Sequence, residues 1–222
     1  MSLILNIDTA LERASVCLAK DGHALEVAIN DNQKDHALWL HNAVDDLLKK
    51  TGNSVAQLEG VAVTIGPGSY TGLRVGLAAA KGLCYVLKIP LITINTLEVI
   101  AFAVKEEAAG LICPMIDARR MEVFTALYDK HLNEKQSPQA IIIDETSFVT
   151  ILSANNILFC GNGHKKFQAL CTNPHAFFSE NVADASHLAQ LSFPRFSSNT
   201  FADLAYTEPL YIKEFYSPER KD

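Results

Sequence analysis

The chain of 222 residues is long enough for one large domain or two small ones, and its 49% hydrophobic and 20% charged residues exclude a disordered or coiled-coil protein. Its 19 lysines and arginines stand against 25 aspartates and glutamates, which gives a net charge of −6. A chain this acidic is a poor candidate for a protein that itself binds the phosphates of a nucleic acid.

The five cysteines show no zinc-type spacing and no C-x-x-C pair, and most of them lie in apolar runs, as buried free thiols do. A reducing compartment fits this usage best. The first residues lack the basic start of a signal peptide, and the longest apolar run, 73–87, contains Lys81 and is shorter than a membrane span. We therefore expect a soluble cytoplasmic protein.

The first half of the chain alternates between predicted strands and helices. Apolar runs bounded by turn signals predict strands at 2–8, 14–20, 24–30, 60–65 and 90–94. One helix is expected over 36–50 with Asp35 as its N-cap, and another over 73–87 after a glycine-rich turn at 66–72. A third helix is expected from Asn95 to about Glu107.

The second half restarts the same pattern. Residues 112–117 are again an apolar run that ends in Asp, and a strand at 123–128 and a turn at 129–131 follow at the spacing seen near the N-terminus. A duplicated unit would give two similar α/β lobes, whereas two unrelated hairpins would show the same periodicity. Beyond this we expect a strand at 156–160 that runs into Gly161-Asn-Gly163, a helix over 183–191, and an irregular tail from Ser192.

The helix at 36–50 has apolar residues on two faces. Its core stripe consists of Ala37, Leu40, Val44, Leu47 and Leu48. Leu38 and Trp39 lie instead among polar neighbours, which fits either scattered surface residues or an interface.

The helix at 73–87 has more apolar residues than a helix that packs one face on a sheet needs. Leu73, Leu77, Ala80, Cys84 and Leu87 share one face, and Val75, Ala79, Gly82 and Val86 continue around the back. Arg74, Lys81 and Lys88 form one narrow stripe. Cover within the chain would explain the second apolar face, but we favour a helix bundle with a partner, since glycines inside a helix need a packing reason.

The glycine-rich turn and the end of the first strand together form a candidate phosphate site. Its residues are Asp8, Thr9, Gly66, Gly68, Ser69, Thr71 and Gly72. Backbone amides at a helix start suit an anion, but the same residues would make a tight turn in which Ser69 or Thr71 caps the helix. No glycine follows Asp8 before Gly22, so a side chain at position 10 would crowd a phosphate. The pattern favours a degraded nucleotide site and a structural turn.

The remaining polar motifs offer little chemistry. The seven histidines include no H-E-x-x-H or H-x-x-x-H pair, so no metal site is predicted, and His36 and His41 are expected at the surface. Asp117, Arg119, Arg120 and Glu122 form a charge cluster after a strand. Such a cluster is typical of a solvated hairpin or a structural salt bridge, and it stays a candidate functional cluster without a nucleophile.

Several motifs carry a resemblance to a known family. Residues 65–76, I-G-P-G-S-Y-T-G-L-R-V-G, closely resemble the G-P-G-S-F-T-G-L-R-x-G signature of the TsaB (YeaZ) family. Residues 3–9 with Ser15 and Val16 resemble its opening strand pair, 114–124 resemble its P-x-x-D-A-R-R-x-E-V-Y segment, and 208–213 resemble its P-x-Y-L-R tail. Ala10, where the family often has Ser, and residues 131–200 depart from the pattern.

This resemblance implies an α/β fold of the actin-like or Hsp70-like ATPase (ASKHA) type, with duplicated mixed-sheet lobes. Residues 1–108 would be an N-terminal lobe with partner-binding helices, and residues 109–222 a C-terminal lobe with an irregular tail. It also implies membership of the bacterial complex that makes N6-threonylcarbamoyladenosine next to the tRNA anticodon.

In that family TsaB is a non-catalytic subunit that pairs with its paralogue TsaD through two helices of the N-terminal lobe. The resemblance implies that ATP and metal belong to the partner subunits, TsaD and the additional ATPase TsaE, with no cofactor on this chain. tRNA would be reached through the complex, and the isolated chain could form a homodimer. The implied interface consists of Leu38, Trp39, Val75, Ala79, Gly82 and Val86, with Arg74 and Lys81 as its polar rim.

Two other classes of function stay open. The chain could be an enzyme by itself, related to ATPases, sugar kinases or metallopeptidases, or a free-standing homodimeric binding module. The missing H-x-x-x-H pair and the missing glycine after Asp8 count against the enzyme.

Overall fold

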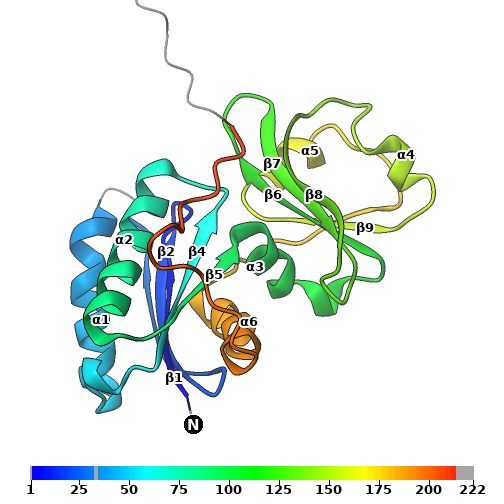
Figure 1. Ribbon diagram of the computed structural model, residues 1–222. Helices are drawn as coiled ribbons and strands as arrows, with labels where there is room; N and C mark the ends of the chain where they lie inside the picture. Colours follow the sequence, from blue (N-terminus) through cyan, green and yellow to red (C-terminus); the bar gives the residue numbers. More distant parts are fainter. Residues whose placement is uncertain (1, 33–34, 214–222) are drawn as a thin grey trace, which may run out of the picture.

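The fold is that of two α/β lobes connected side by side, as the computed structural model shows (Figure 1). The structure describes residues 2–32 and 35–213. Residues 214–222 of the predicted tail therefore lie outside the described residues. In the part described, no helix combines the length and the apolarity needed to cross a membrane.

The first lobe is built on a five-stranded mixed sheet in the order β3-β2-β1-β4-β5. Its strands are β1 (Leu3–Asp8), β2 (Ala14–Lys20), β3 (His23–Asn30), β4 (Gly60–Gly66) and β5 (Leu91–Asn95). β2 is antiparallel to both β1 and β3, whereas β4 is parallel to β1 and to β5. All five strands were predicted within a few residues, since each is a short apolar run with turn residues at its ends.

The second lobe repeats this sheet. Its strands are β6 (Leu111–Asp117), β7 (Glu122–Tyr128), β8 (Glu134–Ile142), β9 (Ile157–Cys160) and β10 (Ala176–Phe178). Read from β8, the order is β8-β7-β6-β9-β10, with the same parallel and antiparallel pairs as in the first lobe. The central strands β1 and β6 both end in an aspartate, Asp8 and Asp117. The predicted duplication is therefore confirmed.

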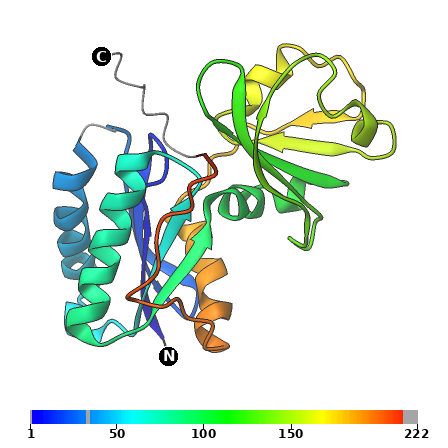
Figure 2. The ribbon, with the colours of Figure 1, turned by 45° about the horizontal axis from the view of Figure 1, so that its top comes forward.

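Helices cover both faces of the first sheet (Figure 2). α1 (His36–Thr51) and α2 (Tyr70–Leu87) pack on one face, and α6 (Ala185–Ser197) packs on the other. Along β1, Leu3, Leu5 and Ile7 belong to the core under α1 and α2, whereas Ile4 lies in the core with Leu188 of α6. Burial of both faces explains why β1 is one continuous apolar run.

The other helices are short, and all but η2, which precedes β4 in the first lobe, lie in or near the second lobe. They are η2 (Val55–Gln57), α3 (Thr96–Ala103), η3 (Lys105–Glu107), α4 (Val149–Leu152) and α5 (His164–Gln168), with η2 and η3 being 3-10 turns. Asn95 caps α3 through a 2.8 Å hydrogen bond from the amide of Leu97, as predicted. Strands β8 and β10 and helices α4 and α5 were not predicted, because their exposed or short segments carry weak periodicity.

Several boundaries differ from the prediction. α2 begins at Tyr70 and not at residue 73, because the Ser69 hydroxyl accepts a hydrogen bond from the Gly72 amide over 3.3 Å. Asp35 precedes α1, but its side chain makes no capping hydrogen bond, so this part of the prediction is wrong. α6 continues through Pro194 to Ser197, so the irregular tail starts after residue 197 and not at Ser192.

The chain returns to the first lobe after the second sheet. The predicted division at 108/109 assigned residues 185–197 to the second lobe, whereas α6 packs on the first sheet; the boundary itself stays a prediction. Residues 201–213, here called the C-terminal strap, then run along the first lobe toward the second (Figures 1 and 2). The strap is attached by the Ala202 amide to Leu91 O (2.9 Å) and by the Leu210 amide to Ile65 O (2.7 Å).

Candidate functional site

The glycine-rich turn packs its backbone directly against the end of β1. A Cβ atom at Gly68 would lie 2.3 Å from the carbonyl oxygen of Ala10, and one at Gly72 would lie 2.0 Å from the carbonyl oxygen of Thr9. Neither contact is tolerable, so both positions require glycine for close approach. The signature of residues 66–76 therefore fixes the start of α2 on the segment that follows β1.

Two backbone amides of the candidate phosphate site are hydrogen-bonded within the chain. The Ser69 amide donates to Ala10 O over 2.7 Å, and the Gly72 amide donates to the Ser69 hydroxyl. These amides would otherwise be available to an anion at the helix start. The Ala10 carbonyl and side chain pack against Gly68. These bonds are those of a structural turn, although Gly68, Ser69 and Thr71 also line the interlobe cavity described below.

Asp8 is buried beside this turn. Its Oδ1 accepts hydrogen bonds from the Thr64 hydroxyl (2.8 Å) and the Ala10 amide (3.1 Å). Burial raises the pKa of Asp8 above its ordinary value and outweighs these two bonds, which lower it. The Asp8 carboxyl group thus joins the start of the turn after β1 to β4 through its two hydrogen bonds. Its buried environment disfavours the charged form.

The second lobe has an equivalent turn at Gly161-Asn-Gly163. A Cβ atom at Gly161, where φ is +83°, would lie 2.5 Å from the carbonyl oxygen of Met115. The Gly163 amide donates to the same oxygen, and Asn162 Oδ1 accepts from the Asp117 amide over 3.0 Å. The two turns face one cavity of about 650 Å³ between the lobes, lined among others by Glu12, Tyr70, Arg119 and Asn162.

The Asp117 cluster is held together by residues that sequence reasoning missed. Lys166 lies 2.6 Å from Asp117 and Lys213 lies 2.6 Å from Glu122. Burial tends to raise the pKa of Asp117, but hydrogen bonds from Lys166 and from the Arg119 amide outweigh it and lower the pKa. Both acidic members of the cluster are thus neutralised by lysines from α5 and from the strap.

Arg119 and Arg120 form the tip of the β6–β7 hairpin. Both residues are exposed and adopt left-handed backbone angles, with φ of 69° and 49°. The Arg119 amide is bonded to Asp117 Oδ1 over 2.6 Å, which stabilises this turn. The cluster is thus a hairpin held by ion pairs, one of the two interpretations that the sequence left open.

Of the two histidines expected at the surface, His36 and His41, one is buried. His36 is 5% exposed, and its ring nitrogens lie 3.3 Å from Leu11 O and 3.4 Å from Asn30 Nδ2, so its predicted surface position is wrong. His41 is exposed as expected. Within residues 2–32 and 35–213, no three His, Cys, Asp or Glu side chains gather as a metal would require.

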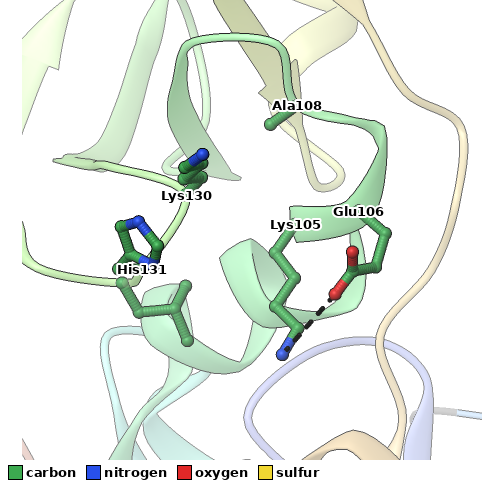
Figure 3. Close-up of a pocket in the computed structure, with 6 residues that line it drawn as sticks. Lys105, Glu106, Ala108, Lys130 and His131 are labelled. Atoms are coloured by element: carbon green, nitrogen blue, oxygen red, sulfur yellow. Dashed lines mark ion pairs between the residues drawn. The ribbon is translucent and has the colours of Figure 1, made fainter.

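A further cavity lies between η3 and the turn after β7 (Figure 3). It measures about 500 Å³ and is lined by Lys105 and Glu106 of η3 on one side and by Lys130 and His131 of the turn after β7 on the other. Lys105 Nζ lies 3.8 Å from Glu106 Oε1 and 4.2 Å from the centre of the Phe102 ring. These partners hold the lysine at the wall of the cavity.

The outer face of α2 is apolar, and no residue of 2–32 or 35–213 covers it. Tyr85 is 77% exposed and Val86 is 75% exposed, and a Cβ atom at Gly82 would meet no atom within 4 Å. On α1, Leu38 is 74% exposed, whereas Trp39 is half-buried against the core. Val75 and Ala79 are half-buried. Tyr85 was not predicted from the sequence as an interface residue. Its position on the helical wheel is next to that of Arg74, which was assigned to the rim of the interface.

The buried side of both helices agrees with the predicted stripes in most positions. Leu40, Val44, Leu47 and Leu48 of α1 are buried under α2 and the sheet. Ala37, which was assigned to the same stripe, is exposed.

The two cations of α2 have partners within the chain. Lys81 Nζ donates to the carbonyl oxygens of Ala205 (3.2 Å) and Thr207 (3.1 Å), and Arg74 Nε donates to the Tyr211 hydroxyl (2.9 Å). Both side chains thus bind the C-terminal strap, although they were expected at the polar rim of an interface.

Comparison with known proteins assigns the family. The family model "TsaD: tRNA N6-adenosine threonylcarbamoyltransferase" matches residues 27–207. The chain belongs to this family. Its resemblance to the TsaB (YeaZ) members is confirmed by "YeaZ from Pseudomonas aeruginosa", a solved structure with a TM-score of 0.82 and 25% identity that covers 95% of this chain and 100% of that one. The actin-like fold of two duplicated lobes is that of the TsaB/YeaZ structures.

Curated relatives include TsaB and TsaD proteins. The tRNA threonylcarbamoyladenosine biosynthesis protein TsaB of Bacillus subtilis (strain 168) is 37% identical over 125 residues, which are 56% of this chain and 54% of that protein. The tRNA N6-adenosine threonylcarbamoyltransferase of Desulfitobacterium hafniense (strain Y51) is 31% identical over 129 residues. The match covers 51% of this chain and 38% of that protein. The matched region thus spans about half the length of the TsaB relative, and less of the transferase.

Proposed function

We propose that this chain is a non-catalytic subunit in the biosynthesis of N6-threonylcarbamoyladenosine in tRNA. It binds and supports a TsaD-type partner that transfers the threonylcarbamoyl group to the adenosine next to the anticodon. The observation that carries this proposal is the uncovered apolar face of α1 and α2, in a chain whose relatives bear the names of that pathway.

The composition of this face supports docking of another helix pair. Leu38, Tyr85 and Val86 are each about three-quarters exposed, which is uncommon for side chains of this size in a monomer. Gly82 offers open space for a second backbone, and a glycine inside a helix otherwise costs about 1 kcal/mol relative to alanine. An interface of standard size, roughly 1,600 Å², would cover this face on both partners.

The hydrogen bonding of the turn beside Asp8 supports the non-catalytic assignment. The amides of Ser69 and Gly72 donate hydrogen bonds within the chain, and the Ala10 carbonyl group lies against Gly68. We therefore assign ATP and metal to the partner subunits, TsaD and TsaE, with tRNA bound through the complex and no cofactor held by this chain.

The test is reconstitution of the modification with and without this chain. TsaD, TsaE, threonylcarbamoyl-adenylate, ATP and tRNA are combined, and N6-threonylcarbamoyladenosine is measured by mass spectrometry of digested tRNA. We expect product formation to depend on this chain. Equal product in its absence would contradict the proposal.

The docking face is tested by co-purification with TsaD. Gly82→Leu and Val86→Glu are expected to abolish pairing, whereas Val149→Glu, at a position 52% exposed on the second lobe, is the matched control that should pair normally. Circular dichroism confirms that each variant is folded. Undiminished pairing of both α2 variants would remove this face from the proposal.

The alternative is a stand-alone ATPase, kinase or peptidase-like enzyme. The interlobe cavity of about 650 Å³ is the feature that favours it. Calorimetry of the isolated chain with ATP and Mg²⁺, followed by a turnover assay, separates the two functions. Tight binding with turnover would establish the enzyme and overturn the assignment of ATP to the partners.

A further inference from the structure

The C-terminal strap is fixed along one side of α2. The Lys81 ammonium group binds the carbonyl oxygens of Ala205 and Thr207, on either side of Tyr206. Asp203 Oδ1 accepts hydrogen bonds from the amides of Ala205 (2.8 Å) and Tyr206 (3.0 Å), which closes a tight turn. Although this turn is held at both ends, the Tyr206 side chain is 84% exposed.

The strap is attached to α2 a second time at Arg74, about two helical turns before Lys81. The Tyr211 ring lies 5.4 Å from the Tyr70 ring, and its hydroxyl accepts from Arg74 Nε. A Cβ atom at Gly66, where φ is +120°, would lie 2.6 Å from Leu210 O, so glycine is needed here for the strap to approach the end of β4. The strap is thus packed and hydrogen-bonded as an integral part of the first lobe.

The positions on α2 show where the strap lies relative to the exposed face. At 100° per residue, Arg74, Lys81 and Tyr85 fall within about 40° of one another, so the strap flanks the helix on the side of Tyr85. On the opposite side, Ala79 and Leu83 line a groove with His41 and Asp45 of α1. The exposed face of α2 therefore lies between α1 and the strap.

The strap also holds the two cations of α2 at one side of this face. Arg74 and Lys81 are the two cations on this stretch of α2, and both bind strap atoms. What is left between the strap and α1 is Ala78, Gly82, Tyr85 and Val86, which are exposed and uncharged. Such a surface fits an apolar helix with small residues and not an acidic or basic partner.

We propose that the C-terminal strap forms one wall of the docking surface for the helix pair of a TsaD-type chain, with Tyr206 as a contact residue beside Tyr85 and Val86. This inference rests on the proposed function. The TsaD family model spans α1 and α2 of this chain, so a TsaD-type partner carries an equivalent helix pair. Exposed tyrosines held by rigid neighbours are frequent anchors of interfaces. Lys81 and Arg74 are then positioning residues that hold the strap.

The experiment measures the dissociation constant of the full chain with its own TsaD by calorimetry. We expect Tyr206→Ala to weaken pairing at least tenfold, Tyr206→Phe to keep most of the affinity, and Lys81→Met to weaken pairing by releasing the turn. Phe177→Ala, at a position 48% exposed on β10, is the aromatic control expected to pair as the parent does. Thermal unfolding confirms that each variant is folded.

Val86→Glu separates this inference from the proposed function. If Val86→Glu abolishes pairing while Tyr206→Ala and Lys81→Met leave the dissociation constant unchanged, the strap is not part of the surface and the inference is overturned, although the docking face stands. If Val86→Glu also pairs normally, the proposed docking face fails, and the role of the strap fails with it.

Discussion

The hydroxyl group of Thr9 donates a 2.7 Å hydrogen bond to the carbonyl oxygen of Gly72, which joins the end of β1 to the first turn of α2 across 63 residues of sequence. The contact requires glycine on the helix: a Cβ atom at Gly76 would lie 2.3 Å from the same hydroxyl oxygen. In this chain the long glycine signature is therefore a device for packing two backbones together.

Gly72→Ala is expected to destabilise the protein by about 3 kcal/mol, because the new methyl group would lie 2.0 Å from the Thr9 carbonyl oxygen and neither backbone can give way cheaply. The free energy of unfolding, measured in urea, checks this value. Gly82→Ala is the matched control on the same helix. Since its Cβ atom meets open space, it should raise stability by up to about 1 kcal/mol through helix propensity. Equal effects at the two positions would contradict the packing role.

Asp8→Asn is expected to change how stability depends on pH. Burial raises the pKa of Asp8, so the folded protein holds a proton that the unfolded chain releases above about pH 4. The parent therefore loses stability as pH rises through this window, and the variant does not. The variant's free energy of unfolding, relative to the parent's, should rise from pH 4 toward neutrality.

Asp117→Asn provides a comparison of opposite sign. Because the pKa of Asp117 is lowered, its stabilising effect is present above the ordinary pKa and is lost as pH falls through the lowered value. The relative stability of this variant should therefore improve on acidification below about pH 4. Parallel pH profiles for the two variants would refute the two environments described for these carboxyl groups.

Cysteine reactivity should single out one of the five thiols. Cys17, Cys84, Cys113 and Cys160 are buried, and Cys171 is partly exposed. Burial raises the pKa of Cys17 and Cys113 to about 12 and that of Cys84 to about 11, so little thiolate forms at pH 8. We expect iodoacetamide to label one site in the native protein, lost in Cys171→Ser, and five sites in denaturant. Fast labelling of the native Cys171→Ser variant would contradict the burial of the other four.

Arg195 fastens α6 to the first lobe. Its Nη2 lies 2.8 and 2.7 Å from the two carboxylate oxygens of Glu98, and its Nη1 donates to Thr93 O over 2.7 Å. Arg195→Ala would leave a mostly buried carboxylate without its partner, and we expect a loss of about 2 kcal/mol in the free energy of unfolding. Lys50→Ala, which breaks the exposed pair with Glu26, should cost less than about 0.5 kcal/mol. A loss at Arg195 no larger than this would show that the pair contributes little.

The secondary structure was predictable wherever periodicity is local. β1, β4 and β6 are apolar runs buried on both faces, and α2 follows a glycine turn with a capping serine, so residues a few positions apart carry the signal. β8 was missed because its side chains are mostly half-exposed and it contains Pro138, which is tolerated here because β8 is an edge strand.

The candidate site was only partly predictable for the same reason. Helical spacing identified Val86 and Gly82 as an outer face of α2, since positions on one helix follow from sequence alone. The wheel could not show that Lys81 binds residues 205 and 207, or that His36 lies under Leu11 O, because those partners are far away in the chain.

The sequence by itself determined the two-lobed repeat of strand, aspartate and turn, the glycine signature, and the excess apolar surface of α2. Only the tertiary structure decided that the glycine turn is filled by Thr9 and Ala10, that α6 belongs to the first sheet, and that the strap takes up the cations of α2. The physical reason is distance along the chain. Spacing fixes neighbours within one helix or strand, whereas contacts between residues such as Arg74 and Tyr211, 137 positions apart, exist only in the folded chain.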